Sequence, residues 1–225
     1  MGTPLKNICV VTGYIPLPAQ PRGPEVYGAL GERLKELKVP VFPFYDIARE
    51  TWMYKMVEAL PFTPTVSVSD NPMKNNFLYH CVQHQKFQWL YEASKHKANR
   101  HAKVFIWLDY GIFSVPGISA AVINDMLDRV STADLCIPGC WPRGDINDEH
   151  PCWRFCGGLL VVPRRYVQPL KNLVQVVSML HVRVTRNVTF EVNTLSRVEQ
   201  TGKIPIKWYK ADHNETLFTN YPGAK

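Results

Sequence analysis

The stretch that decides the fold is Lys103-Val-Phe-Ile-Trp-Leu-Asp-Tyr-Gly-Ile-Phe113, where a continuous apolar run stops at a carboxylate followed by a glycine. Val104 to Leu108 is short and has no polar alternation, which indicates a strand covered on both faces in the middle of a parallel sheet. Ligands of open α/β sheets bind outside the carboxyl ends of central strands, so Asp109 is placed for a ligand or a metal ion. Simple capping of the loop by Asp-x-Gly explains this stretch alone equally well.

The segments before this strand show a βαβ pattern. A strand is expected over residues 7–12, then a proline-rich loop, a helix with apolar residues at helical spacing over 26–37, and a second strand over 39–44. This order predicts a right-handed crossover and a parallel sheet. Pro40 and Pro43 cannot donate hydrogen bonds to a neighbouring strand, so the second strand is expected at an edge.

Later segments continue the alternation. Helices are expected over 75–97, 118–130, 164–184 and 188–200, and strands over 65–68, 134–138 and 204–209, with a further strand following Gly157-Gly158. The sequence therefore predicts an α/β fold: one domain over residues 1–225, with a Rossmann-like, mostly parallel central sheet flanked by helices.

The chain of 225 residues has 26 Lys and Arg against 19 Asp and Glu, a formal charge of +7. This charge favours anionic partners, namely nucleotides, phosphorylated glycans, nucleic acid or acidic membrane surfaces. The basic residues are dispersed, so a dedicated DNA-binding module is not the first interpretation. Without an export signal or a long apolar segment, we expect a soluble cytoplasmic protein with no stable membrane insertion.

Four of the six cysteines form two equally spaced pairs, Cys136 with Cys140 and Cys152 with Cys156. Two such pairs around a loop raise the hypothesis of a structural zinc site. Zinc knuckles usually have two residues between their cysteines, whereas three lie between them here, so reduced thiols of the core and loop are the favoured interpretation. The loop over 139–150, rich in Gly, Pro and Asn, is typical of a lid.

Three other features point to a site. Gly157 and Gly158 precede an apolar strand and would let a ligand approach the backbone, although a β-bulge or a close packing contact explains them equally well. Glu191 is an acid on a largely apolar face, and His213 follows the last strand, where a neutral imidazole can bind a divalent ion. No phosphate-binding loop, dinucleotide fingerprint or nucleophile elbow is present, which weakens kinase and dehydrogenase interpretations.

Four segments carry a resemblance: Val-Thr-Gly-Tyr after the first strand, Gln85-Lys-Phe-Gln-Trp-Leu-Tyr-Glu-Ala93, Ile106-Trp-Leu-Asp-Tyr-Gly-Ile112 and Phe155-Cys-Gly-Gly-Leu159. In them the chain resembles the HtrL/YibB-like family, which is similar to nucleotide-sugar-dependent glycosyltransferases of the GT-A fold. The resemblance spans most of the chain, and its specific parts are Trp-Leu-Asp-Tyr-Gly and Phe-x-Gly-Gly.

The resemblance implies a metal-assisted transfer of a sugar from a nucleoside-diphosphate sugar, with a UDP-sugar expected, to a glycan acceptor. Asp109 and His213 would hold Mn²⁺ or Mg²⁺ at the leaving diphosphate, and Asp109 and Glu191 would be catalytic. The donor would contact the remaining residues: Thr12, Gly13, Tyr14, Lys86, Trp107, Gly157 and Gly158. The sequence departs from the usual pair of acids flanking one residue, because Trp107 and Gly111 stand at those positions.

Two other functions stay open at this point. The charge and the small size are compatible with glycosylation of a modified base in DNA, as in phages. A non-catalytic nucleotide-binding or glycan-binding module on the same fold is also compatible, because a fold alone does not establish an activity.

Overall fold

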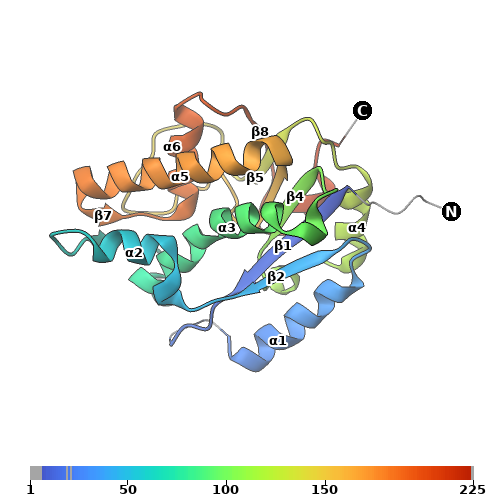
Figure 1. Ribbon diagram of the computed structural model, residues 1–225, viewed down its shortest axis with the longest axis horizontal. Coiled ribbons are helices and arrows are strands. Elements are labelled where there is room, and N and C mark those ends of the chain that lie inside the picture. The colour runs from blue at the N-terminus through green and yellow to red at the C-terminus, as the bar shows by residue number, and fades with distance from the viewer. Residues whose placement is uncertain (1–6, 19, 21, 224–225) are drawn as a thin grey trace.

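The computed structural model describes residues 7–18, 20 and 22–223, which are built on a six-stranded sheet in the order β2-β1-β4-β6-β5-β8 (Figure 1). The strands are β1 (Ile8–Tyr14), β2 (Val41–Tyr45), β4 (Val104–Leu108), β5 (Leu135–Gly139), β6 (Leu159–Pro163) and β8 (Ile206–Lys210). Five strands run parallel to one another and β6 runs antiparallel to β4 and β5. The predicted α/β fold with a mostly parallel central sheet is confirmed, as are the buried position of β4 and the edge position of β2.

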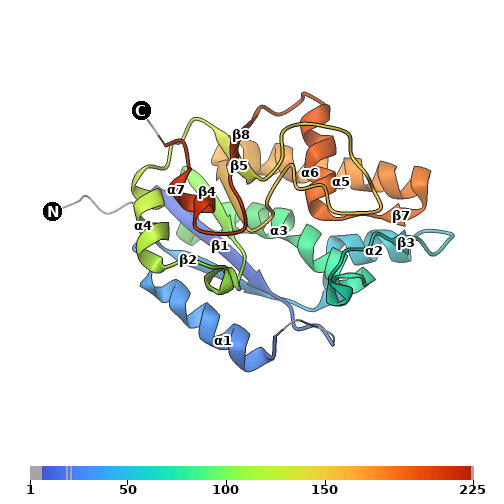
Figure 2. The ribbon, with the colours of Figure 1, turned by 180° about the vertical axis from the view of Figure 1, so that it is seen from behind.

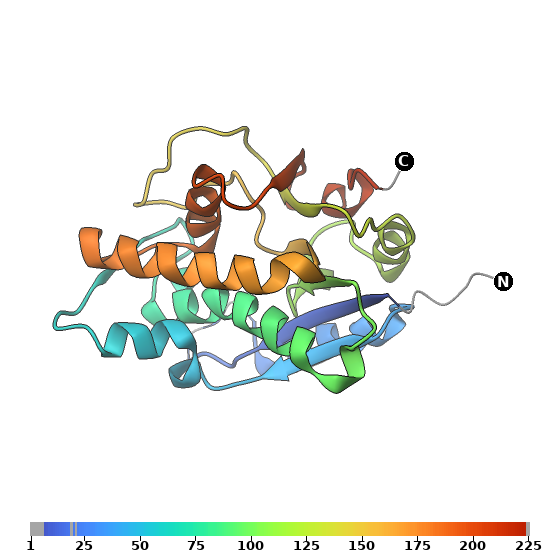
Figure 3. The same cartoon turned by 45° about the horizontal axis from the view of Figure 1, so that its top comes forward.

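Helices cover both faces of this sheet. One face packs against α3 (Phe77–Lys95), α5 (Arg164–Thr185) and α6 (Glu191–Gln200), and Figure 3 shows α3 and α5 side by side there. The other face, seen in Figure 2, packs against α1 (Pro24–Glu32), α4 (Ala120–Asp128) and α7 (Thr216–Thr219). Successive residues of a strand point to opposite faces, so Val10 and Val11 enter different cores.

The smaller elements lie around this frame. A two-stranded sheet joins β3 (Thr65–Val66) to β7 (Asn187–Val188), and α2 (Trp52–Glu58) precedes it. The 3-10 helices are η1 (Arg33–Glu36), η2 (Ala48–Glu50), η3 (Pro72–Lys74), η4 (Lys97–Asn99) and η5 (Ile112–Ser114). Among the helices that the structure describes, none is both long and apolar enough to cross a membrane.

The helix expected over 188–200 is wrong at its beginning. Val188 belongs to β7, where it pairs with Val66, and Phe190 has an extended backbone. Helix α6 therefore begins at Glu191. The apolar periodicity could not show this boundary, because the strand that sets it depends on pairing with a segment more than a hundred residues earlier.

The direction of β6 brings two distant segments to one edge of the sheet. Because β6 is antiparallel to β4, the residues that precede β6 lie beside the residues that follow β4. Leu108 pairs with Leu159, and the backbone N–H of Asp109 donates to the carbonyl of Gly158 at 3.1 Å. Asp109, which follows β4, and the glycines that precede β6 therefore lie side by side at the carboxyl ends of the parallel strands.

Gly139 at the end of β5 lets the chain of residues 153–156 pass very close. A Cβ atom at Gly139 would lie 1.7 Å from the carbonyl oxygen of Arg154 and 2.5 Å from Nε1 of Trp208. We expect Gly139→Ala to lower the free energy of unfolding by about 1–3 kcal/mol, as overpacking does elsewhere. Urea denaturation measures this. Gly144→Ala is the matched control, since nothing lies within 4 Å of its added Cβ, and equal losses in both variants would contradict the packing argument.

Candidate functional site

A cavity of about 760 Å³ opens at this edge of the sheet. Its volume falls within the range of roughly 300–1,000 Å³ that is typical of small-molecule sites. All of the predicted site residues except Thr12 line it, namely Gly13, Tyr14, Lys86, Trp107, Asp109, Gly157, Gly158, Glu191 and His213. The fold therefore gathers residues from β1, α3, β4, α6 and the segments after β4, before β6 and after β8.

The expectation that Thr12 lines the nucleotide pocket is wrong. Its side chain is fully buried in β1 and is not part of the cavity lining. The cavity begins one residue later, at Gly13 and Tyr14. Gly13 is needed there for packing, because a Cβ atom would lie 2.3 Å from the ring of Trp89.

Lys86 is the centre of the polar wall of the cavity. It lies on α3 and is only 1% exposed. Its ammonium donates to the carbonyl of Gly157 at 2.8 Å and to Oε1 of Glu191 at 3.2 Å, and lies 3.6 Å from Oδ1 of Asp109. Gln83 accepts a further hydrogen bond at 3.2 Å. The ammonium is therefore already bonded by the protein, and it joins the two predicted catalytic acids.

Asp109 has one oxygen engaged and one turned toward Gly158. Its Oδ1 accepts from Nε1 of Trp107 at 2.7 Å and faces Lys86. Its Oδ2 lies beside Gly158, where an added Cβ atom would make an ordinary contact of 3.5 Å with it. The Asp109 side chain is 41% exposed. It thus presents a carboxylate oxygen to the cavity while the indole fixes its orientation.

Glu191 is an ionised acid in a buried position, 6% exposed at the beginning of α6. Burial raises the pKa of Glu191, but the Lys86 ammonium and the neighbouring His84 lower it more, and the net pKa is lowered. Burial also lowers the pKa of Lys86, yet Asp109 and Glu191 outweigh this and raise it. Both partners are therefore charged at neutral pH, and Glu191 is suited to accept hydrogen bonds and poorly suited to donate a proton.

Gly157 makes room for this ion pair. A Cβ atom there would lie 2.1 Å from Oε1 of Glu191 and 3.0 Å from Nζ of Lys86. The close packing contact, one of the alternatives to ligand approach, therefore explains Gly157, and the contact is with side chains of the site itself.

Four aromatic and basic residues of the cavity, Arg22, Tyr27, Lys74 and Tyr110, were not predicted from the sequence. The ring of Tyr14 stacks on that of Tyr110, with centroids 5.2 Å apart, and lies 5.1 Å from that of Tyr27. Arg22 and Lys74 also line the cavity. Tyr110 follows Asp109 directly and could have been noticed, whereas Lys74 belongs to η3 and no pattern in the sequence marks it.

His213 lines the cavity, as expected, and its ring nitrogen Nδ1 faces a cysteine thiol. Its Nδ1 lies 3.8 Å from Sγ of Cys140, which in turn lies 3.5 Å from Sγ of Cys156. Burial of part of the ring and the charge of Lys74 lower the pKa of His213, so the imidazole is neutral at pH 7. Its pairing with Asp109 on one metal ion stays a prediction.

The hypothesis that four cysteines bind zinc together is wrong. Cys136 is buried in β5 within the core that contains Tyr209 and Tyr221, and the sulfur of Cys152 lies 3.8 Å from Oγ of Ser196. Within the described part of the chain, the metal-ligand group contains only Cys140, Cys156 and His213. The group thus contains the second cysteine of each pair, Cys140 and Cys156, and does not contain the first, Cys136 and Cys152.

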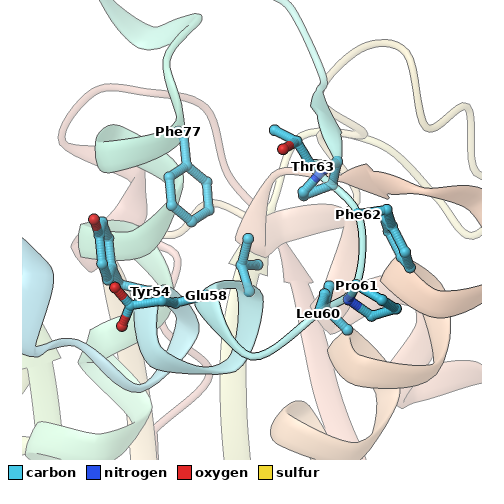
Figure 4. Close-up of a pocket in the computed structure, with 9 residues that line it drawn as sticks. Tyr54, Glu58, Leu60, Pro61, Phe62, Thr63 and Phe77 are labelled. Carbon is cyan, nitrogen blue, oxygen red and sulfur yellow. The ribbon is translucent and has the colours of Figure 1, made fainter.

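A second cavity, of about 500 Å³, lies beside α2 and is shown in Figure 4. Its lining is mostly apolar, with Leu60, Pro61, Phe62 and Phe77 among its residues, and Glu58 is the charged residue in it. It contains none of the predicted site residues, so the candidate site is the cavity at the sheet edge.

Comparisons with known proteins find a weak similarity to two solved structures. No protein-family model and no curated protein matches the chain. The crystal structure of a glycosyltransferase involved in the glycosylation of the major capsid of PBCV-1 is similar with a TM-score of 0.49 and 10% identity, covering 91% of this chain and 81% of that chain. The apo form of mouse xyloside xylosyltransferase 1 is similar with a TM-score of 0.45 and 8% identity, covering 90% and 84%.

Both of these structures are glycosyltransferases by name. A likeness at these scores and identities assigns neither a family nor an activity to this chain. Membership of the HtrL/YibB-like family therefore stays a prediction.

The two adjacent glycines provide a test of the ion pair. In Gly157→Ala the new methyl group would displace the Glu191 carboxylate from Lys86, so we expect a loss of about 1–3 kcal/mol in the free energy of unfolding. Gly158→Ala is the control, because its Cβ makes an ordinary 3.5 Å contact with Asp109. Chemical denaturation of both variants gives the comparison, and a loss in Gly158→Ala as large as that in Gly157→Ala would contradict this role.

Removal of the Lys86 charge should leave Glu191 buried without a partner. We expect Lys86→Met to lose about 3–5 kcal/mol of stability at pH 8, as other broken buried pairs do. In the wild type the pKa of Glu191 is depressed below its ordinary value of 4.5, so the ion pair stabilises the fold above pH 4.5. This stabilisation is lost as the pH falls through the pKa that Glu191 has in the folded protein. In the variant burial raises that pKa, so the deficit should shrink as the pH falls from 8 to 5.

Denaturation curves at pH 5 and pH 8 measure this difference. The double variant Lys86→Met/Glu191→Gln is the matched control, since it buries no unpaired carboxylate and should lose less stability than Lys86→Met alone. A deficit in Lys86→Met that is the same at both pH values would show that Glu191 is not the group left without a partner.

Proposed function

We propose that this chain is a GT-A-like glycosyltransferase that moves a sugar from a nucleoside-diphosphate sugar, with UDP as the expected nucleotide, to an acceptor hydroxyl. The observation that supports it best is the cavity wall in which buried Lys86 lies between two acids, Asp109 and Glu191, beside Gly157 and Gly158. Such a wall suits a ligand that has many hydroxyls and also carries a charged leaving group.

The parts of the donor match different parts of the cavity. The stacked rings of Tyr14 and Tyr110 offer a flat apolar surface for a base. Arg22 and Lys74 offer positive charge for the diphosphate. Lys86 is expected from the resemblance to contact the donor, but its ammonium is bonded to Gly157 and Glu191 and lies beside Asp109, so we assign it the positioning of the two acids.

A divalent cation fits this site through Asp109. Mg²⁺ and Mn²⁺ are commonly held by one or two carboxylates together with phosphate oxygens of the substrate. Lys86, Asp109 and Glu191 together carry one formal net negative charge, and Oδ2 of Asp109 accepts no hydrogen bond from the residues that the structure describes. When bound, the cation would neutralise charge that develops on the leaving diphosphate. The proposed cation site rests on Asp109 alone, because Nδ1 of His213 faces Cys140.

The transfer breaks the bond between the anomeric carbon and the diphosphate oxygen, which leaves with the bonding electrons. A bond forms between the anomeric carbon and the acceptor oxygen, whose proton is released. Glu191 is bonded to Lys86 and keeps a low pKa, so its proposed role is to accept hydrogen bonds from sugar hydroxyls. Gly157 and Gly158 would border the sugar. A base role for Glu191 stays a prediction.

The acceptor is proposed to be a glycan, the default for this class of enzyme. The modified-DNA acceptor stays a prediction, based only on the net charge of +7. A non-catalytic binding module would use the same cavity and is distinguished by turnover: it would bind the nucleotide without releasing the sugar.

The Asp109→Asn variant tests the proposal. We expect binding of UDP in the presence of Mn²⁺ to weaken at least roughly tenfold, and release of sugar from a UDP-sugar to fall roughly 10²-fold or more, the usual loss for removing a group that stabilises transition-state charge. Calorimetry and a screen of nucleotide sugars measure the two effects. Asp125→Asn, an exposed acid of α4 outside the cavity, is the control and should change neither. Unchanged turnover in Asp109→Asn would overturn the assignment.

A further inference from the structure

A group of metal-ligand atoms, from Cys140, Cys156 and His213, lies at one rim of the cavity, which His213 lines. Sγ of Cys140 is 3.5 Å from Sγ of Cys156 and 3.8 Å from Nδ1 of His213. All three ligand atoms lie within 4.8 Å of one another. Two sulfurs and an imidazole nitrogen are ligands that zinc prefers.

Two of the three distances between ligand atoms match those between neighbouring ligands of a tetrahedral zinc ion. Zn–S bonds of about 2.3 Å and Zn–N bonds of about 2.0–2.1 Å place tetrahedral ligands about 3.8 Å apart for two sulfurs and about 3.6 Å apart for sulfur and nitrogen. The observed distances of 3.5 and 3.8 Å differ from these by only a few tenths of an ångström. The third pair, Cys156 and His213, has its ligand atoms within 4.8 Å, so binding of an ion requires at most an adjustment of side chains at this edge.

We propose that Cys140, Cys156 and His213 bind one Zn²⁺ ion, at a site distinct from the acids of the sugar-transfer site. Three protein ligands leave a fourth position for water or a further oxygen. Burial raises the pKa of the Cys140 thiol, and the carboxylate of Asp212, next to His213 in the chain, interacts with this thiol and raises its pKa further. This inference does not depend on the proposed transferase activity.

Backbone hydrogen bonds fix the three ligand-bearing segments. The N–H of Cys140 donates to the carbonyl of Trp153 at 2.9 Å, and the N–H of Cys156 donates to that of Pro138 at 2.7 Å. The segment of His213 is held by the bond from Ala211 to Gly139 at 2.9 Å. These bonds hold three distant segments together at the end of β5, so the ligand positions are a property of the fold.

An ion bound at this position would stabilise the loop that forms one wall of the cavity. Cys140 and Cys156 lie at the two ends of the loop between β5 and β6, residues 140–158. Trp141, His150 and Trp153 of this loop line the cavity. The ring of Trp153 also packs against that of His213, with centroids 4.6 Å apart. A bound ion would therefore fix the ends of a segment that shapes the site.

Cobalt substitution tests the proposal on the full chain, reduced and freed of metal with a chelator. Titration with Co²⁺ should give one equivalent per chain with an intense thiolate-to-cobalt charge-transfer band, and added Zn²⁺ should remove it. Cys140→Ser and Cys156→Ser should lose the band, and His213→Ala should weaken Co²⁺ affinity at least roughly tenfold. Cys152→Ser is the matched control, since this half-buried thiol lies outside the group and should leave the band unchanged.

Trypsin provides a second measurement that does not depend on cobalt. Arg143 is an exposed residue of the same loop, three positions after Cys140. Zn²⁺ should slow cleavage after Arg143 several-fold in the wild type and in Cys152→Ser, and should have no effect in Cys140→Ser. The Cys140→Ser variant must keep the wild-type circular dichroism spectrum, so that lost protection is not a sign of unfolding.

Three results would overturn the proposal. The first is the absence of a charge-transfer band in the wild type, and the second is an unchanged band in Cys140→Ser. The third is a disulfide between Cys140 and Cys156 in protein kept under reductant, because a disulfide removes both thiolate ligands.

Discussion

The buried ammonium of Lys86 is the constraint on which the candidate site depends. A charge that is only 1% exposed is tolerated when it is fully paired, and Lys86 meets this condition with Gly157, Glu191 and Asp109. These partners come from three separate segments, so the ammonium fixes the beginning of α6 and the glycine segment against the end of β4. It also lowers the pKa of Glu191, so that this acid stays ionised beside the cavity.

The strand directions make this meeting possible. Were β6 parallel to its neighbours, Gly157 and Gly158 would lie at the opposite edge of the sheet from Asp109. The single antiparallel strand instead places its beginning beside the ends of the parallel strands, and the bond from Asp109 to Gly158 ties the two together. The same edge brings Cys140, Cys156 and His213 together, because β5 and β8 end there as well.

Two kinds of chemistry thus lie at one edge of the sheet. The acids around Lys86 suit a hydroxyl-rich, charged ligand and a hard cation. The thiols and the imidazole suit zinc. The loop between β5 and β6 connects them, since its ends carry the thiols and its tryptophans line the cavity. A zinc ion would therefore influence the shape of the site while remaining outside the reaction.

The sequence by itself determined the class of fold and the position of its central strand. The apolar run of residues 104–108 predicted β4 at its observed bounds, and Pro40 and Pro43 correctly placed β2 at an edge, because these signals are local. Asp109, Gly157 and Glu191 were marked for the same reason: each interrupts an apolar pattern. Only the tertiary structure decided their partners. That Lys86 binds both acids, that Thr12 is buried and that His213 meets two thiols all follow from strand pairing between segments distant in sequence, and periodicity carries no information on such contacts.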